Sequence, residues 1–192
     1  MASTSVITTI AGIGSAGYSG NNGQATAAAI YNPTGVNLDI SGNVYFGDCC
    51  GGYNVVRKIT VSTGVISTVA GTGSASGGYN GDNIQATAAM LNTPQNVVFD
   101  VNNNLYISDS SNNRIRKVDL LTGVITTVIG TGTASSTGDG SAATSATING
   151  PGYSRFDSAG NYYISETGGN RVRKVMTVTT DIPTSAPSMT PR

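Results

Sequence analysis

The sequence has no histidine and no tryptophan among its 192 residues, and only two cysteines. Without histidine a Ser-His-Asp triad, a Cys-His pair and a histidine-based metal site are excluded. Cys49 and Cys50 are adjacent, so a disulfide between them would close a small, strained ring. We expect two small loop residues here, with a bridge within or between chains as the alternative.

Net charge and long apolar runs are also absent. Ten basic residues balance ten acidic ones, so no overall field attracts nucleic acid or an anionic membrane. No stretch approaches the roughly 20 apolar residues that span a bilayer. Residues 1–12 lack the basic start and long apolar core of a secretory signal. We therefore expect no membrane partner, and nucleic acid is not favoured.

What the chain does contain is a repeat. "VITTIAGIG" near the start returns as "VISTVAGTG" and "VITTVIGTG", so that Ile7, Ile66 and Ile125 are equally spaced. Each copy continues with a Gly/Ser loop, an Ala-rich stretch and three more strand-like runs joined by turns such as "SGN". Four short strands per copy are typical of a propeller blade. We predict an all-β fold of three four-stranded repeats.

Alternation within the strands indicates that these sheets are buried on both faces. In "NVYFGD", Val44 and Phe46 point to one face and Tyr45 to the other. A sheet with two apolar faces needs a neighbour on each side. The repeats are therefore expected to stack as blades.

Several motifs carry a resemblance to a known family. They are "PQNVVFD" (Pro94–Asp100), with a weaker form at Pro33–Asp39, "NNLYISD", and "NNRIRKV" (Asn112–Val118) with "GNRVRKV" as its counterpart. Over about residues 5–176 the chain resembles NHL repeats, which implies blades of a six-bladed β-propeller. The resemblance says little about function, because propellers host many roles.

The repeat pattern divides the chain into five parts. They are an outer strand that completes another blade (1–12), repeat 1 (13–71), repeat 2 (72–130), repeat 3 without its outer strand (131–176) and a tail (177–192). Propellers typically have about four to eight blades, so three cannot close. We predict half of a six-bladed propeller, closed by strand exchange between chains, with Val6, Ile7 and Ile10 on the exchanged strand. A filament and a piece of a longer propeller are the alternatives.

Acidic residues recur at the end of the third strand-like run of each copy, as Asp48, Asp109 and Glu166. A catalytic pair needs to occur only once, so repetition favours a structural role. We expect turn capping and ion pairs, for example Asp109 with Arg114 and Glu166 with Arg171. We predict that the chain is not an enzyme and has no cofactor and no metal; calcium held by loops with one carboxylate each is the weak alternative.

Most basic residues lie on the last strand-like run of each copy: Arg57, Lys58, Arg114, Arg116, Lys117, Arg171, Arg173 and Lys174. We expect solvated strand faces with ion pairs. An anionic ligand is an alternative, and so is RNA, which some NHL domains bind. Aromatic residues that could stack on bases are not interleaved with these side chains.

The tail is rich in Thr, Ser and Pro and cannot pack a core. It is typical of an O-glycosylated stalk or of a plain disordered tail, with Thr184, Ser185, Ser188 and Thr190 as candidate glycan sites. We therefore predict a structural, self-assembling protein outside the cell or at its surface, its partner being itself. The alternative is a propeller module that binds another protein, a glycan or an anion.

Overall fold

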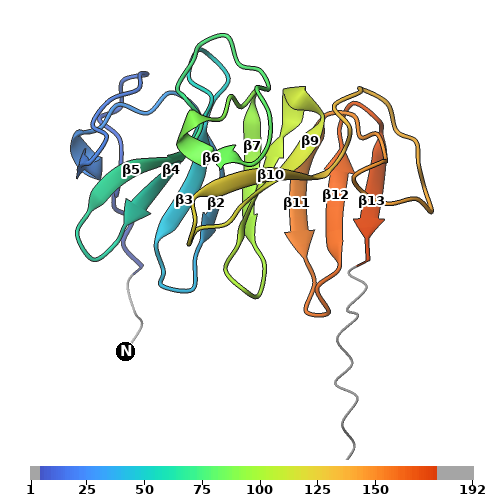
Figure 1. Cartoon of the computed structure of the whole chain (residues 1–192). Coiled ribbons are helices and arrows are strands. Elements are labelled where there is room, and N and C mark those ends of the chain that lie inside the picture. The colour runs from blue at the N-terminus through green and yellow to red at the C-terminus, as the bar shows by residue number, and fades with distance from the viewer. Residues whose placement is uncertain (1–4, 177–192) are drawn as a thin grey trace, which may run out of the picture.

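The computed structural model describes residues 5–176 and consists of β-strands, with three single 3₁₀ turns as the helical elements of that range. Its strands form three antiparallel sheets that succeed one another along the chain, from left to right in Figure 1. The predicted all-β architecture is confirmed. Within the described range no helix is long and apolar enough to cross a membrane.

Each sheet is called a blade here, numbered in chain order. Blade 1 contains β1 (Gly23–Gln24), β2 (Pro33–Leu38), β3 (Val44–Asp48), β4 (Val55–Thr60) and β5 (Val65–Ala70). Blade 2 contains β6 (Ile84–Gln85), β7 (Pro94–Phe99), β8 (Leu105–Asp109), β9 (Arg114–Val118) and β10 (Val124–Ile129). Blade 3 contains β11 (Pro151–Phe156), β12 (Tyr162–Glu166) and β13 (Arg171–Val175). The strand order is β1-β5-β4-β3-β2, β6-β10-β9-β8-β7 and β11-β12-β13.

The short strands β1 and β6 and the turns η1 (Ala25–Ala27) and η2 (Ala86–Ala88) come from the Ala-rich stretches. Both short strands pair with the outer strand of their own blade. Small side chains allow this stretch to lie flat against the sheet. A third turn, η3 (Ser110–Asn112), leads from β8 to β9.

The hairpins between the first two long strands of each blade are closed by a carboxylate. Asp157 Oδ1 accepts hydrogen bonds from the backbone N–H groups of Ala159 and Asn161, and Asp39 and Asp100 do the same in the other blades. The Asn161 side chain also donates to Asp157 and is the largest cause that lowers the pKa of this carboxyl. These three carboxylates therefore cap the hairpin turns of their blades.

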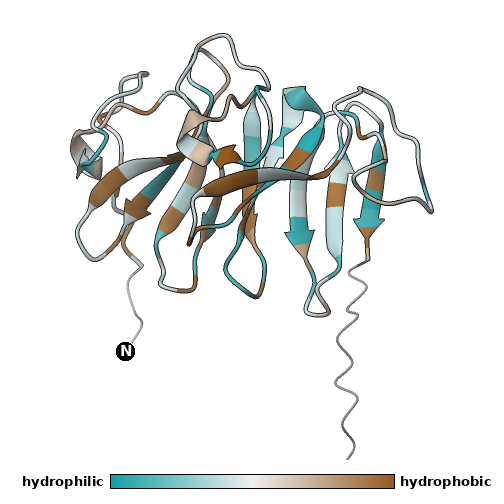
Figure 2. Cartoon of the chain, viewed as in Figure 1, coloured by the Kyte–Doolittle hydropathy of each residue, from teal (hydrophilic) through white to brown (hydrophobic). Residues whose placement is uncertain are grey.

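Much of the apolar core lies where the faces of neighbouring blades pack on each other, and each of these interfaces is called a joint here. Tyr45, Val56 and Ala70 of blade 1 belong to one buried cluster with Val97 and Leu105 of blade 2. A second cluster joins blade 2 to blade 3 in the same way. Figure 2 shows hydrophobic segments along the strands of the blades, with the longest on β5 and β10. The prediction that both faces of a blade are apolar holds for these two joints.

Candidate assembly site

The outer strands β5 and β10 complete the sheets of blades 1 and 2. β5 pairs with β4, and Ile66 lies opposite Ile59; β10 pairs with β9, and Ile125 lies opposite Val118. Both Ile66 and Ile125 are completely buried. Burial of an isoleucine contributes about 1.5–3 kcal/mol, so each outer strand is a substantial part of its blade.

Blade 3 has no such strand among residues 5–176, because β13 is the last strand of its sheet. On the outer face of the same strand, Val172 is 75% exposed, whereas Val56 and Ile115 at the same place in β4 and β9 are completely buried. The backbone edge of β13 is therefore open, and open edges of this kind readily pair with another chain.

A cavity of about 540 Å³ lies against this open edge. Its walls are largely apolar and include Ile129, Ala143, Ala146, Ile148, Ile164 and Val175. In blade 2 the equivalent space, between Ala86, Leu91 and Val118, is filled by Ile125 in one buried cluster. The cavity is thus the slot that an outer strand occupies in the other blades.

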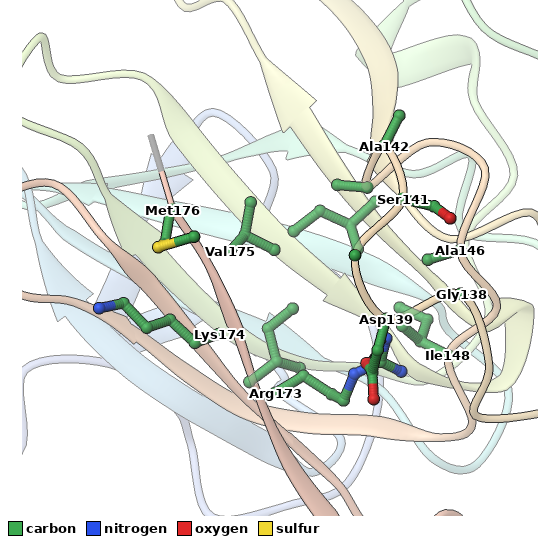
Figure 3. A pocket seen from close by; sticks show the side chains of 14 residues that line it. Gly138, Asp139, Ser141, Ala142, Ala146, Ile148, Arg173, Lys174, Val175 and Met176 are labelled. Carbon is green, nitrogen blue, oxygen red and sulfur yellow. The ribbon is translucent and has the colours of Figure 1, made fainter. Parts of the chain in front are cut away.

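At the rim of the cavity Asp139 and Arg173 face each other (Figure 3) and form an ion pair, with 2.6 Å between Oδ1 and Nη2. In blade 2 the matching Asp82 pairs with Arg116 and also accepts a hydrogen bond of 3.0 Å from Thr127 of β10. The Asp139 side chain is 77% exposed, whereas that of Asp82 is 27% exposed. The carboxylate of Asp139 is therefore accessible to a donor on an outer strand.

Residues 5–10 have the sequence of an outer strand but form none in this chain. Ile7 is 98% exposed, and Val6 and Ile10 are also exposed. The next two residues occupy the position that the end of an outer strand has in the other blades. Ala11 packs on the apolar cluster of blade 1, and the Gly12 N–H donates a hydrogen bond to the Ala25 carbonyl. Gly71 and Gly130 make the same hydrogen bond to the next blade. Residues 5–10 thus extend from the side of blade 1 where a preceding blade would lie.

The recurrent carboxylates are buried and ion-paired, but with other arginines than predicted. Asp48 pairs with Arg57 at 3.4 Å, Asp109 with Arg116 at 3.5 Å and Glu166 with Arg173 at 3.0 Å. Each of these arginines lies two residues after the residue that is paired with the carboxylate in the strand register. The arginine side chain is long enough to reach back diagonally to the carboxylate.

The arginines that were predicted as partners make other contacts. Arg114 lies over the Tyr79 ring, 3.8 Å from its centre, and donates to the carbonyl of Thr131. Arg171 donates to the carbonyl of Ser136. The pairs Asp109–Arg114 and Glu166–Arg171 were therefore wrong.

Two basic residues are not on solvated faces. Arg57 and Arg116 are completely buried, which corrects the expectation of solvated strands at these positions. Burial raises the pKa of Asp109 to about 6, whereas hydrogen bonds from Asn112 and Asn92 and the charge of Arg116 act to lower it. These groups are inside the blades and are not free to contact RNA or an anion in solution.

The cysteines are free thiols in the structure, Cys49 buried and Cys50 exposed, so the bridge between them is not formed. Burial raises the pKa of Cys49 to about 12, so its thiol is a poor nucleophile. In the part of the chain that the structure describes, no cluster of three or more acidic or cysteine side chains could hold a metal. Thr184, Ser185, Ser188 and Thr190 lie outside the described residues.

Comparisons with known proteins support the fold. No family model and no curated protein matches the sequence. A structural genomics protein of unknown function from Bacteroides thetaiotaomicron matches over 74% of this chain and 34% of its own, with 29% identity and a TM-score of 0.63. An auxiliary nutrient binding protein from Bacteroides ovatus matches over 72% of this chain and 36% of its own, with 20% identity and a TM-score of 0.54. The chain thus spans about a third of the solved structures that it matches.

These neighbours are propeller-like proteins. They also overturn the prediction that the chain is not an enzyme, since virginiamycin B lyase from Staphylococcus aureus is among the matches. That match covers 76% of this chain and 38% of the lyase, with 12% identity and a TM-score of 0.46. A match at this level assigns no chemistry to the present chain.

Proposed function

We propose that this chain is a self-assembling unit of an NHL-type β-propeller, in which residues 5–11 of one copy form the outer strand of blade 3 in another copy. The cavity beside β13 carries the proposal. It corresponds to the slot that β5 and β10 fill in blades 1 and 2, and the exposed segment has nearly the sequence of those strands.

The register of the exchanged strand follows from the other two blades. Because Ile66 faces Ile59 and Ile125 faces Val118, Ile7 of the incoming strand faces Val175. Ile7 then enters the apolar cavity. Thr9 falls where Thr127 lies in blade 2 and donates to Asp139, as Thr127 donates to Asp82.

The substitution Ile7→Asp tests this proposal. Ile7→Asp should weaken self-association by about 10- to 100-fold, because about 1.5–3 kcal/mol of burial is lost and a charge would have to enter an apolar slot. Mass is measured by light scattering over a range of concentrations. Leu121→Asp is the matched control, since Leu121 is as exposed as Ile7 but lies in a turn of blade 2. Equal masses for Ile7→Asp and the unchanged chain would refute the exchange, as would an unchanged chain that stays monomeric throughout.

Ligand binding is a second candidate, favoured by a feature that only blade 1 has within the described range. The Tyr18 and Tyr53 rings stack with 5.2 Å between their centres, and Tyr31 meets Tyr53 edge-on. Tyr53 belongs to the loop that is longer than its counterparts in blades 2 and 3. Such a group of rings offers a flat, partly exposed surface to a sugar or another protein.

A further inference from the structure

We propose that the two end faces of the row of blades dock on each other in a second copy, so that two copies close one ring of six blades. This inference rests on the proposed strand exchange and adds an interface to it. It concerns the broad faces of blades 1 and 3, whereas the exchange concerns the edge of β13.

The outer face of blade 3 carries the residues that form a joint elsewhere. Tyr45 meets Phe99 and Tyr106 meets Phe156 with the same geometry, 4.9 Å between ring centres and 76° between planes. Tyr163 occupies the same position in β12 but is exposed. Lys174 lies over its ring, as Lys58 and Lys117 lie over those of Tyr45 and Tyr106.

The outer face of blade 1 is the complementary half of a joint. Val36 is 66% exposed, whereas Val97 at the same place in blade 2 is completely buried under blade 1. Pro33 is exposed and its counterpart Pro94 is buried. Leu38, which takes the place of Phe99, is exposed as well. In blade 2, β7 is covered by β2 and β3 of blade 1. No blade covers β2 in the same way within the described residues.

These two faces are complementary when equivalent residues make the same contacts as in the joints between blades 1 and 2 and between blades 2 and 3. Val56 and Val97 share one buried cluster at the joint between blades 1 and 2. By the same rule Val172 of one copy contacts Val36 of the other, and Tyr163 covers Leu38. Ala11 already packs on blade 1 as Ala70 packs on blade 2, so the end of the exchanged strand and the docked face belong to one continuous joint.

The number of copies follows from the number of blades. Closed propellers typically have about four to eight blades, and three blades per copy allow only two copies within that range. Each copy then contributes blade 1 to one joint and blade 3 to the other, which is the arrangement of a two-fold dimer.

Substitutions on the two faces test this interface separately from the exchanged strand. Val36→Asp and Val172→Asp should each reduce the two-copy mass seen by light scattering and weaken association by about tenfold or more, since a charge is buried at each joint. Val101→Asp is the matched control, because Val101 is exposed although blade 2 has a neighbour on both sides. A mixture of Val36→Asp and Val172→Asp chains should recover association, since it contains one joint without a substitution.

The outcomes separate the two proposals. If Ile7→Asp abolishes association but Val36→Asp and Val172→Asp do not, the strand exchange stands and the docked faces are wrong. A mass that grows beyond two copies with concentration would overturn the closed ring in favour of a filament. If none of the three substitutions changes the mass, the exchange and the interface both fail.

Discussion

At the scale of single residues, the cost of burying charge is most visible at Asp109. Its carboxylate is completely buried and accepts hydrogen bonds from Asn112 and Asn92 beside Arg116. These donors replace the water that the charge loses. The position recurs as Asp48 and Glu166. In each blade this buried carboxylate accepts a hydrogen bond from the backbone of the segment that precedes the first long strand.

The titration of Asp109 gives a prediction for stability. Burial raises the pKa of Asp109 to about 6, so the folded chain holds this proton more tightly than the unfolded chain. The stabilising contribution is complete below the ordinary carboxyl pKa and is lost as pH rises through about 6. Urea denaturation of the unchanged chain should therefore show a larger fall in unfolding free energy between about pH 4 and pH 6 than Asp109→Asn. Parallel pH profiles for the two chains would contradict the raised pKa.

Residue pairs were the least predictable feature. Asp109 and Arg114 do lie opposite each other in the ladder, as the sequence pattern predicted, but the ion pair goes to Arg116. Strand register determines which backbones are opposite, whereas side-chain length and burial determine which charges meet. Thr9 and Asp139 were missed for a related reason: their importance appears only when Thr127 and Asp82 are seen in contact.

At the scale of elements, the strands were predictable because the repeat presents the same pattern three times. Turn residues, β-branched residues and the two apolar faces all indicated the same blade. The short strands β1 and β6 could not be found, since two residues leave no alternation to detect. Residues 5–10 were predicted as a strand, yet a strand exists only with a partner, and within residues 5–176 they have none.

A disulfide can test the register of the exchanged strand. Thr8 takes the place of Thr126, which lies opposite Lys117, so Thr8 should lie opposite Lys174 of a second copy. Thr8→Cys with Lys174→Cys should form an intermolecular disulfide, because opposite residues have Cα atoms about 4.5–5.5 Å apart. The background carries Cys49→Ala and Cys50→Gly, glycine being suited to the positive φ of Cys50. The product is measured by non-reducing electrophoresis.

The control for this disulfide uses an edge that is already occupied. Thr8→Cys with Lys117→Cys should not cross-link, since β10 covers that edge of β9. Equal yields from both pairs would indicate random collision and refute the register.

At the scale of the whole molecule, the chain resembles an arc with two unlike ends. Blade 2 is covered on both sides, whereas blade 1 and blade 3 each expose a face, and these ends lie at opposite sides of Figure 1. In the proposed ring, a second copy covers both of these end faces. The solved structure of unknown function from Bacteroides thetaiotaomicron extends over about three times the matched length, so the three blades span about a third of it.

Assembly should also be visible in thermal stability. If two copies bury each other's end faces and outer strands, unfolding separates them, and mass action then makes the melting temperature rise with protein concentration. Over a hundredfold range of concentration we expect a rise of about 3 to 5 °C for a chain of this length, measured by calorimetry or circular dichroism. Ile7→Asp should melt at a lower temperature than the unchanged chain at each concentration where the unchanged chain is assembled, because Ile7 stabilises only the assembled form. A melting temperature that is independent of concentration for the unchanged chain would mean that the blades are stable alone, and the exposed end faces would then need a partner other than this chain.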